Sequence, residues 1–235
     1  MTSMPSNSTF AEADFVTSTR IFYDAIAEDY AEHFSGERSA KPRDWTVLAG
    51  FAELVSRGGG GGQVADLGCG PGRSTAFLAT QGLDVFGLDL SESMLAIARR
   101  ENPGLRFRQG SMLELDIPDR ALAAAVSWYS SIHTPVDRLP FLFAEFHRVL
   151  VPGGYLLLAF QAGDQPLTLD QPFGHPVTLD FERRRPDAMA ELLEAAGFAL
   201  RSRTVREAEE ELGESSAQAF LIARKPMAAL AGTGL

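Results

Sequence analysis

The chain has 235 residues, of which 21 are Lys or Arg and 31 are Asp or Glu, so its formal net charge is −10 at pH 7. Its hydrophobic content of 45% is enough for a sizeable core, which excludes a wholly disordered protein. The acidic balance argues against nucleic-acid or anionic-membrane partners, and the one cysteine, Cys69, excludes an internal disulfide framework and fits a reducing cytoplasm.

The N-terminal part of the chain predicts a tail and two helices. Residues 1–15 are expected to form a flexible tail, and they lack the basic and apolar segments of a signal peptide. Apolar residues recur at helical spacing over Thr19–Phe34. Asp44 is placed to cap a second helix, which ends at the glycine run Gly58–Gly62. We interpret that run as a tether before the first strand.

From residue 64 onward, short apolar runs alternate with helical stretches. The strand candidates are Val64–Leu67, Asp84–Leu88, Leu105–Arg108, Leu122–Val126, Tyr155–Phe160, Phe198–Val205 and Ala217–Ala223. The helix candidates are Ser74–Thr80, a helix opening at Ser91, Val136–Leu150, and Pro186–Ala196 closed by Gly197. This alternation predicts a parallel sheet covered by helices on both faces, with ligands outside the carboxyl ends of the strands. The apolar runs are strand-length, far below the about 20 residues that crossing a membrane needs.

Residues 161–183 depart from this alternation. Two Thr-Leu-Asp units, 168–170 and 178–180, flank a turn rich in Pro and Gly, which predicts a small hairpin. Because the segment follows the fifth strand, we expect it to cover the active site together with the first helix, as a lid. His175 at its tip is a candidate base, although an exposed turn residue is the favoured interpretation.

The strongest motif follows the first strand candidate and reads Asp66-Leu67-Gly68-Cys69-Gly70-Pro71-Gly72-Arg73. Its glycines allow a tight turn and close approach of a ligand, and the turn exposes the free N–H groups of the next helix. A dinucleotide-binding fingerprint would have glycine where Arg73 stands. Asp66 would repel a pyrophosphate, but it can hold a cation such as the ammonium group of an amino acid.

Three further strand ends carry candidate site residues. Asp89, at the tip of the second strand, is placed to accept hydrogen bonds from the two hydroxyls of a ribose, since Ser91 already serves as the helix cap. After the third strand, Ser111 can reach the rim of a flat base and Met112 can pack on its face; a buried Met in an ordinary turn is nearly as well supported. The fourth strand ends in the polar and aromatic cluster 127–133.

These motifs, in this order, resemble those of the class I S-adenosylmethionine-dependent methyltransferases that act on small molecules. The resemblance rests on Asp66-x-Gly68-x-Gly70-x-Gly72, Asp89, Gly110-Ser111-Met112, the first-helix pattern Phe22-Tyr23-Asp24-x-Ile26-Ala27-x-x-Tyr30 and the turn Leu150–Gly154. It implies a doubly wound, Rossmann-like α/β fold with a seven-stranded sheet in the order 3-2-1-4-5-7-6, strand 7 being antiparallel. We expect one domain over residues 16–225, with a helical lid at 16–57, the covering insertion at 161–183 and a C-terminal tail at 226–235.

The resemblance also implies a cofactor, S-adenosylmethionine, a product, S-adenosylhomocysteine, and a role for each motif. Asp66 and Gly68 would lie near the methionine moiety, Leu90 and Met94 beside the ribose at Asp89, and Ser111 and Met112 at the adenine. A backbone carbonyl of Ser127 or Trp128 would receive the ammonium group, and Arg73 is placed to pair with the carboxylate. The remaining residues that we assign to the cofactor site are Tyr30, Cys69, Gly70 and Gly72. Many members carry Asp where Ser111 stands, and serine can still accept a hydrogen bond there.

Tyr129 and His133 are the candidate catalytic residues, because this part of the fourth strand end would face the substrate. His133 has a suitable unperturbed pKa for a base, with a structural role as the alternative. No cluster of His, Cys and carboxylates has metal-ligand spacing, so no metal is predicted.

Three other functions stay open from the sequence. They are a nicotinamide-dependent oxidoreductase, a non-catalytic regulatory protein that keeps the fold, and an enzyme that uses the same cofactor for a cyclisation or another non-methyl transfer. The methyl-accepting atom and the oligomeric state are likewise open.

Overall fold

The computed structural model describes residues 7–58 and 62–227. Most of the predicted C-terminal tail, residues 228–235, lies outside the described residues, as do residues 1–6 of the N-terminal tail and residues 59–61 of the glycine run. The first helix, α1 (Asn7–His33), begins before the predicted start at Thr19. Residues 7–15, which we expected to be a tail, are therefore helical.

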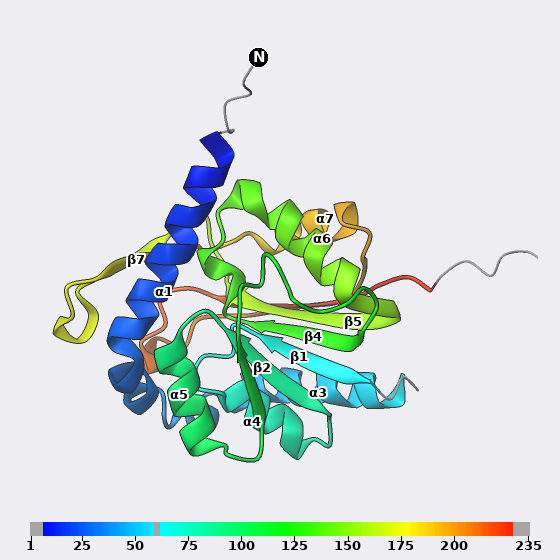
Figure 1. The fold of residues 1–235 in the computed structure, drawn as a ribbon, viewed down its shortest axis with the longest axis horizontal. Coiled ribbons are helices and arrows are strands. Elements are labelled where there is room, and N and C mark those ends of the chain that lie inside the picture. The colour runs from blue at the N-terminus through cyan, green and yellow to red at the C-terminus, as the bar shows by residue number, and fades with distance from the viewer. Residues whose placement is uncertain (1–6, 59–61, 228–235) are drawn as a thin grey trace, which may run out of the picture.

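A seven-stranded sheet forms the centre of the fold (Figure 1). Its strands are β1 (Gln63–Leu67), β2 (Val85–Asp89), β3 (Arg106–Gln109), β4 (Leu122–Trp128), β5 (Leu150–Gln161), β8 (Ala199–Arg206) and β9 (Gln218–Arg224). They lie in the order β3-β2-β1-β4-β5-β9-β8; β9 is antiparallel to both neighbours, and the other pairs are parallel. Because β8 and β9 come sixth and seventh along the chain in this sheet, the predicted strand order and the antiparallel seventh strand are confirmed.

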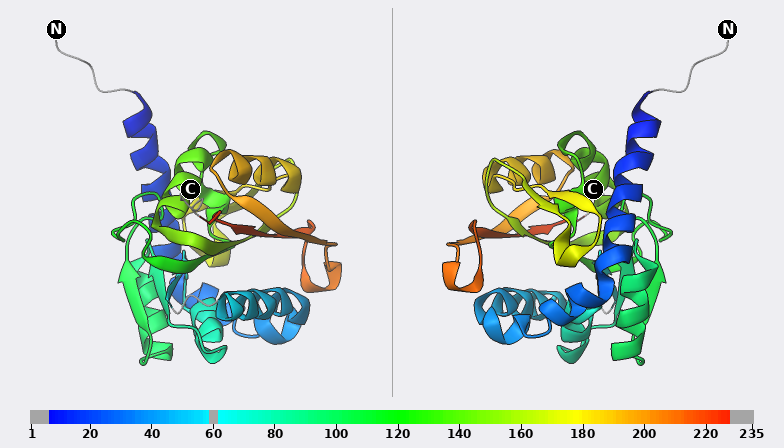
Figure 2. Two further views of the ribbon diagram at one scale, coloured as in Figure 1. Left: turned by 90° about the vertical axis from the view of Figure 1, so that its right-hand side faces the viewer. Right: turned by 90° about the vertical axis from the view of Figure 1, so that its left-hand side faces the viewer.

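Helices cover both faces of the sheet (Figures 1 and 2). One face carries α3 (Pro42–Arg57) and α4 (Arg73–Thr80), and the other carries α6 (Leu139–Val149) and α7 (Pro186–Ala195). Alternate residues of a strand point to opposite faces, so Val64 packs in the α3–α4 core and its neighbour Ala65 in the α6–α7 core. A strand buried on both faces is apolar along its length, which explains why the central strands could be predicted; the edge strands β3 and β8 are largely exposed.

The helix after β2 begins where the sequence indicates. The N-terminal cap of α5 (Glu92–Glu101) is Ser91, whose Oγ accepts a hydrogen bond from Met94 N–H at 3.1 Å. The same hydroxyl donates to Asp24 Oδ1 at 2.6 Å. Since Asp24 belongs to α1, the cap also holds α1 against α5.

Asp44 does not cap the second helix, contrary to our prediction. Lys41 precedes α3, and Asp44 lies in the first turn with its side chain only 4% exposed. Arg206, at the end of β8, donates from Nε to Asp44 Oδ1 at 2.6 Å and from Nη1 to Glu214 Oε2 at 2.6 Å. Lys41 Nζ lies 3.2 Å from Glu214 Oε1. We name Asp44, Arg206 and Glu214 the carboxylate clamp; it fastens α3 to the C-terminal strands.

The insertion at 161–183 contains the predicted hairpin. Its strands β6 (Leu167–Asp170) and β7 (Thr178–Phe181) pair antiparallel, outside the main sheet. The hairpin lies against α1 (Figure 1), where the rings of Phe181 and Phe22 meet edge to face at 5.9 Å. His175 Nε2 lies 2.7 Å from Asp29 Oδ2 of α1.

No described helix has the length and apolar character needed to cross a membrane.

Candidate active site

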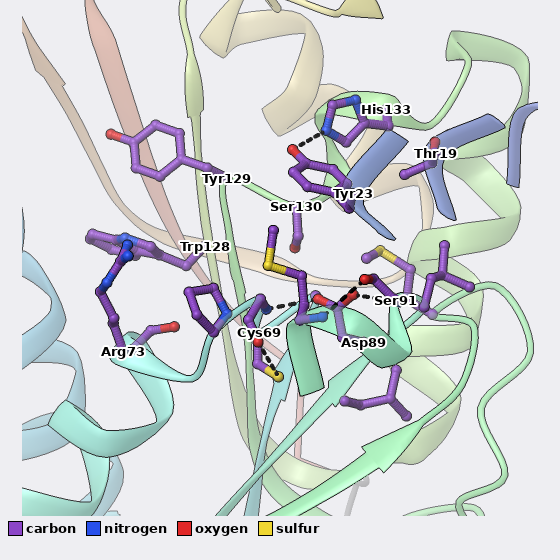
Figure 3. A pocket seen from close by; sticks show the side chains of 18 of the residues that line it. Thr19, Tyr23, Cys69, Arg73, Asp89, Ser91, Trp128, Tyr129, Ser130 and His133 are labelled. Atoms are coloured by element: carbon purple, nitrogen blue, oxygen red, sulfur yellow. Dashed lines mark hydrogen bonds between the residues drawn. The ribbon is translucent and has the colours of Figure 1, made fainter. Parts of the chain in front are cut away.

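A cavity opens where β1, β2 and β4 end, with α1 along one wall (Figure 3). It encloses about 850 Å³ of space between the atoms, part of it open to solvent. The predicted site residues that line it are Tyr30, Gly68, Cys69, Gly70, Arg73, Asp89, Leu90, Met94, Met112, Trp128, Tyr129 and His133. The predicted site residues that do not line it are Asp66, Gly72, Ser111 and Ser127.

The glycine-rich turn brings the backbone close to two other segments. Gly68 has φ +74°, and a Cβ there would lie 2.3 Å from the Ser130 Cβ. Gly72 has φ +83°, and a Cβ there would lie 2.9 Å from the Phe107 ring. Gly70 also has a positive φ, +51°, but its Cβ position has no atom within 4 Å. Glycine is therefore required at 68 and 72 for packing, and at 70 only for backbone conformation.

Replacing Gly68 by alanine is expected to lower the free energy of unfolding by at least about 2 kcal/mol, because a left-handed backbone and an overpacked contact each add a cost. Gly70→Ala is the matched control, with an expected loss of about 1 kcal/mol from the backbone alone. Urea unfolding of both variants measures the difference. Equal stability of the two would contradict the close contact at Ser130.

Asp89 fixes the geometry of the cavity floor. Its Oδ2 accepts a hydrogen bond from Gly70 N–H at 2.7 Å, and its Oδ1 accepts one from Ser91 N–H at 2.9 Å (Figure 3). Burial raises the pKa of Asp89 above its usual value, although these backbone N–H groups oppose the shift. A carboxylate has about four lone-pair sites, so Asp89 can still accept a hydrogen bond from a ligand.

Asp66 lies beneath the turn and does not line the cavity. Its Oδ2 accepts hydrogen bonds from Ser74 Oγ at 2.7 Å and Thr75 Oγ1 at 2.6 Å, both in the first turn of α4. Burial raises its pKa to about 6, and its Oδ1 has no hydrogen-bond partner within the described structure. Asp66 therefore braces the start of α4 and adds negative charge below the cavity.

Arg73 and Tyr30 stand together at the cavity wall. Arg73 Nη2 donates to the Ala31 carbonyl of α1 at 2.7 Å, and its guanidinium lies 6.0 Å from the centre of the Tyr30 ring. This contact fixes the guanidinium against α1 while the side chain still lines the cavity. Cys69 also lines the cavity, and burial raises the pKa of its thiol well above the usual value. It therefore stays a neutral packing group.

Some residues of the turns after β3 and β4 line the cavity, and others bond within the protein. Met112 lines the cavity, whereas the Ser111 hydroxyl accepts a hydrogen bond from Leu113 N–H at 3.2 Å. Ser130 Oγ donates to the Leu67 carbonyl at 2.5 Å, so Ser127 Oγ, 2.8 Å away, donates to Ser130. These serines join the ends of β1 and β4, which explains why Ser127 is buried away from the cavity.

Aromatic side chains from three elements form the rest of the lining. Trp45 of α3 and Trp128 of β4 have ring centres 6.1 Å apart, and Trp128 meets Tyr129 edge to face at 5.6 Å. Tyr129 has φ +55°, an uncommon conformation for a residue with a side chain, and its hydroxyl donates to Asp44 Oδ2 at 3.4 Å. The carboxylate clamp thus also supports the wall formed by Tyr129.

His133 lies in a short 3-10 helix, η1 (Ser131–His133), and meets α1 across the cavity. Its Nε2 is 2.8 Å from Tyr23 Oη, and its Nδ1 is 3.0 Å from the Asp180 carbonyl of β7 (Figure 3 shows the first contact). Burial lowers the pKa of His133 to about 4, so the imidazole is neutral at neutral pH. Burial also raises the pKa of Tyr23 well above its usual value, so the phenol keeps its proton.

Sequence reasoning missed several lining residues, including Thr19, Tyr23, Trp45, Ser91 and Ser130. Tyr23 belongs to the first-helix pattern that the sequence does show, but its partner lies 110 positions away. The 161–183 insertion contributes no described residue to the lining. It acts on the cavity through Asp180 and through its contacts with α1. Among the described residues, no group of three or more His, Cys, Asp or Glu side chains is arranged to hold a metal.

Comparison with known proteins finds sequence similarity to methyltransferases. The family model described as a methyltransferase domain matches residues 64–154, from β1 to the start of β5. The trans-aconitate 2-methyltransferase of Methylobacterium nodulans is 37% identical over 115 residues, which are 47% of this chain and 40% of that protein. The malonyl-(acyl-carrier protein) O-methyltransferase of Pectobacterium atrosepticum is 33% identical over 114 residues, which are 46% of this chain and 42% of that protein.

Solved structures share the fold over nearly the whole chain. The Burkholderia thailandensis 1,6-didemethyltoxoflavin-N1-methyltransferase, with bound 1,6-didemethyltoxoflavin and S-adenosylhomocysteine, has a TM-score of 0.68 at 20% identity; the match covers 96% of this chain and 93% of that one. The strand order and these matches define a class I methyltransferase fold. Residues 64–154 are similar in sequence to methyltransferase domains, and the chain shares the fold of solved methyltransferases. It spans less than half the length of the two curated relatives named above.

Proposed function

We propose that the protein transfers a methyl group from S-adenosylmethionine to a small-molecule acceptor. The observation that carries this proposal is Asp89, a buried carboxylate fixed by two backbone N–H groups with its remaining lone pairs at the cavity floor. An acceptor-only group in this position suits the vicinal hydroxyls of a ribose. The family match supports the same cofactor.

The other lining residues fit the two ends of that cofactor. Leu90, Gly110 and Met112 supply a flat apolar slot for the adenine. Gly70 leaves open space beside the turn, where the amino-acid end would approach the backbone. Arg73 supplies a cation for its carboxylate, and the charge of Asp66 below favours its ammonium group. When bound, the cofactor supplies an electrophilic methyl group on a sulfonium, whose departure leaves an electron pair on sulfur.

The chain's own contribution is alignment and exclusion of water. An in-line displacement depends chiefly on holding the acceptor at the correct distance and angle. The aromatic walls and α1 enclose the acceptor side, and the hairpin β6–β7 backs α1 from outside. We therefore assign residues 16–57 and 161–183 the role of covering the site, with Tyr129 and His133 facing the acceptor.

Titration with S-adenosylhomocysteine tests this function directly. Both tryptophans of the chain line the cavity, so we expect saturable, micromolar binding that changes the tryptophan emission. Trp128→Phe should remove most of the change while calorimetry still detects binding. Binding of NAD⁺ in place of S-adenosylhomocysteine would favour an oxidoreductase instead. If neither ligand binds, the non-catalytic regulatory protein becomes the better interpretation.

The proposal also includes the class of acceptor and the cellular compartment. The net charge of −10 makes a nucleic-acid substrate unfavourable, which is consistent with a small-molecule acceptor. The single free cysteine suits a reducing compartment, and we assign the protein to the cytoplasm.

A further inference from the structure

The lining of the cavity divides into a charged part and a neutral part. The described lining side chains with a formal charge at neutral pH are Arg73 and Asp89, and both lie toward the glycine-rich turn (Figure 3). On the other side lie Tyr23, Tyr129 and His133, with Thr19 beside them (Figure 3). Because no guanidinium or ammonium group of the described lining stands on that side, a carboxylate acceptor would be buried there without a partner.

The hydrogen bonds of His133 determine which nitrogen carries its proton. The Asp180 carbonyl can only accept, so Nδ1, 3.0 Å away, carries the hydrogen. In a neutral imidazole the other nitrogen then accepts, so Tyr23 Oη donates to Nε2 at 2.8 Å. Tyr23 lines the cavity, and its phenol oxygen keeps lone pairs that can accept a hydrogen bond from a ligand hydroxyl.

We propose that Tyr23 and His133 form a proton-accepting pair for an uncharged aromatic acceptor that bears a hydroxyl group. The proposal rests on the methyltransferase function proposed above and names its acceptor class. Tyr23 is the catalytic residue that touches the acceptor, and His133 is the final base. The aromatic rings of Tyr23, Trp128 and Tyr129 suit a planar acceptor.

Two proton transfers accompany the methyl transfer. The acceptor's O–H proton passes to Tyr23 Oη while Tyr23's own hydroxyl proton passes to His133 Nε2. Tyr23 ends with the same number of protons, His133 becomes an imidazolium, and the acceptor oxygen forms the new bond to the methyl carbon. The imidazolium charge appears as the sulfonium charge is lost, so the net charge inside the cavity does not change. This compensates for the low basicity that burial gives His133.

The first test is nuclear magnetic resonance of the imidazole nitrogens in the protein saturated with S-adenosylhomocysteine. The chain has 4 histidines, and His133→Gln identifies the signal. We expect the Nδ1–H form, neutral down to pH 5. An Nε2–H form overturns the proposal, because Nε2 could then not accept the proton of Tyr23. Since S-adenosylhomocysteine binding is measured separately, these outcomes leave the methyltransferase function standing.

The second test is calorimetric binding of three matched probes to the same complex. They are 4-hydroxyacetophenone, 4-methoxyacetophenone and 4-acetylbenzoate, which differ only in the group presented to Tyr23. We expect the hydroxyl probe to bind about fivefold more tightly than the methoxy probe, the value of one hydrogen bond, and the carboxylate probe to bind most weakly. Tyr23→Phe should abolish the hydroxyl preference, and Tyr155→Phe, a tyrosine outside the lining, should retain it. Tighter binding of the carboxylate, or no binding of the hydroxyl probe, overturns the assigned acceptor class.

Discussion

Asp89→Ala is expected to weaken S-adenosylhomocysteine binding by at least about 100-fold. The carboxylate is the acceptor that we assign to both ribose hydroxyls, and hydrogen bonds to a charged group contribute about 1.5–3 kcal/mol each. It also holds the glycine-rich turn through Gly70 N–H and the start of α5 through Ser91 N–H. Calorimetric titration of wild type and variant at one pH and salt concentration measures the effect.

The stability of this variant should change much less than its affinity. Burial raises the pKa of Asp89, so removing the ionised carboxylate relieves a desolvation cost that offsets the two lost hydrogen bonds. Asp84→Ala is the matched control, because Asp84 precedes β2 at its opposite end and forms an exposed ion pair with Arg106. Undiminished binding by Asp89→Ala would refute the proposed cofactor site. A large loss of stability with no loss of affinity would make Asp89 a purely structural residue.

Arg206→Leu is expected to lower the free energy of unfolding by about 3–5 kcal/mol, because it leaves the buried carboxylates of Asp44 and Glu214 without their shared cation. The side chains of Arg206, Asp44 and Glu214 are 9%, 4% and 5% exposed. Arg57→Leu is the control: Arg57 pairs with Glu53 at the surface, and such pairs are worth about 0–1 kcal/mol. Urea unfolding of both variants at pH 7 provides the comparison.

The cost of Arg206→Leu should also depend on pH, with a definite sign. Burial alone would raise the pKa of Glu214, but hydrogen bonds from Arg206, Glu209 N–H and Lys41 hold it down at about 2. The contribution of Glu214 to the free energy of unfolding is therefore complete above the ordinary pKa of Glu. It is lost as the pH falls toward 2. In the variant, acid instead neutralises the Glu214 carboxylate, which has lost Arg206. The stability difference between the two proteins should shrink below pH 4.5; a difference that grows there would contradict the clamp.

The strands and the glycine-rich turn were predictable because their signals are local. A strand buried on both faces must be apolar throughout, and a turn with φ values of +74° and +83° at Gly68 and Gly72 must use glycine. Ser91 was likewise predictable, since the cap and its donor, Met94 N–H, lie only three positions apart in the chain.

The sequence does not reveal the partners of several polar side chains. Asp44 looks like a helix cap by its position, but its partner Arg206 is 162 residues away. His133 and Tyr23 are 110 residues apart, so neither their hydrogen bond nor the shifted pKa of His133 could be inferred. Asp66 turns toward Ser74 and Thr75, 8 and 9 positions further on, a direction that the packed start of α4 determines.

The position of β9 has a consequence for how the chain acquires its structure during synthesis. This last strand lies between β5 and β8, and its residues Phe220 and Ile222 pack in the same core as Trp45 and Leu48 of α3. A ribosome releases α3 early and β9 last. Until the final strand emerges, α3 has an apolar face with part of its binding surface missing. Part of the apolar face of α3 therefore stays uncovered while β1 to β8 are synthesised.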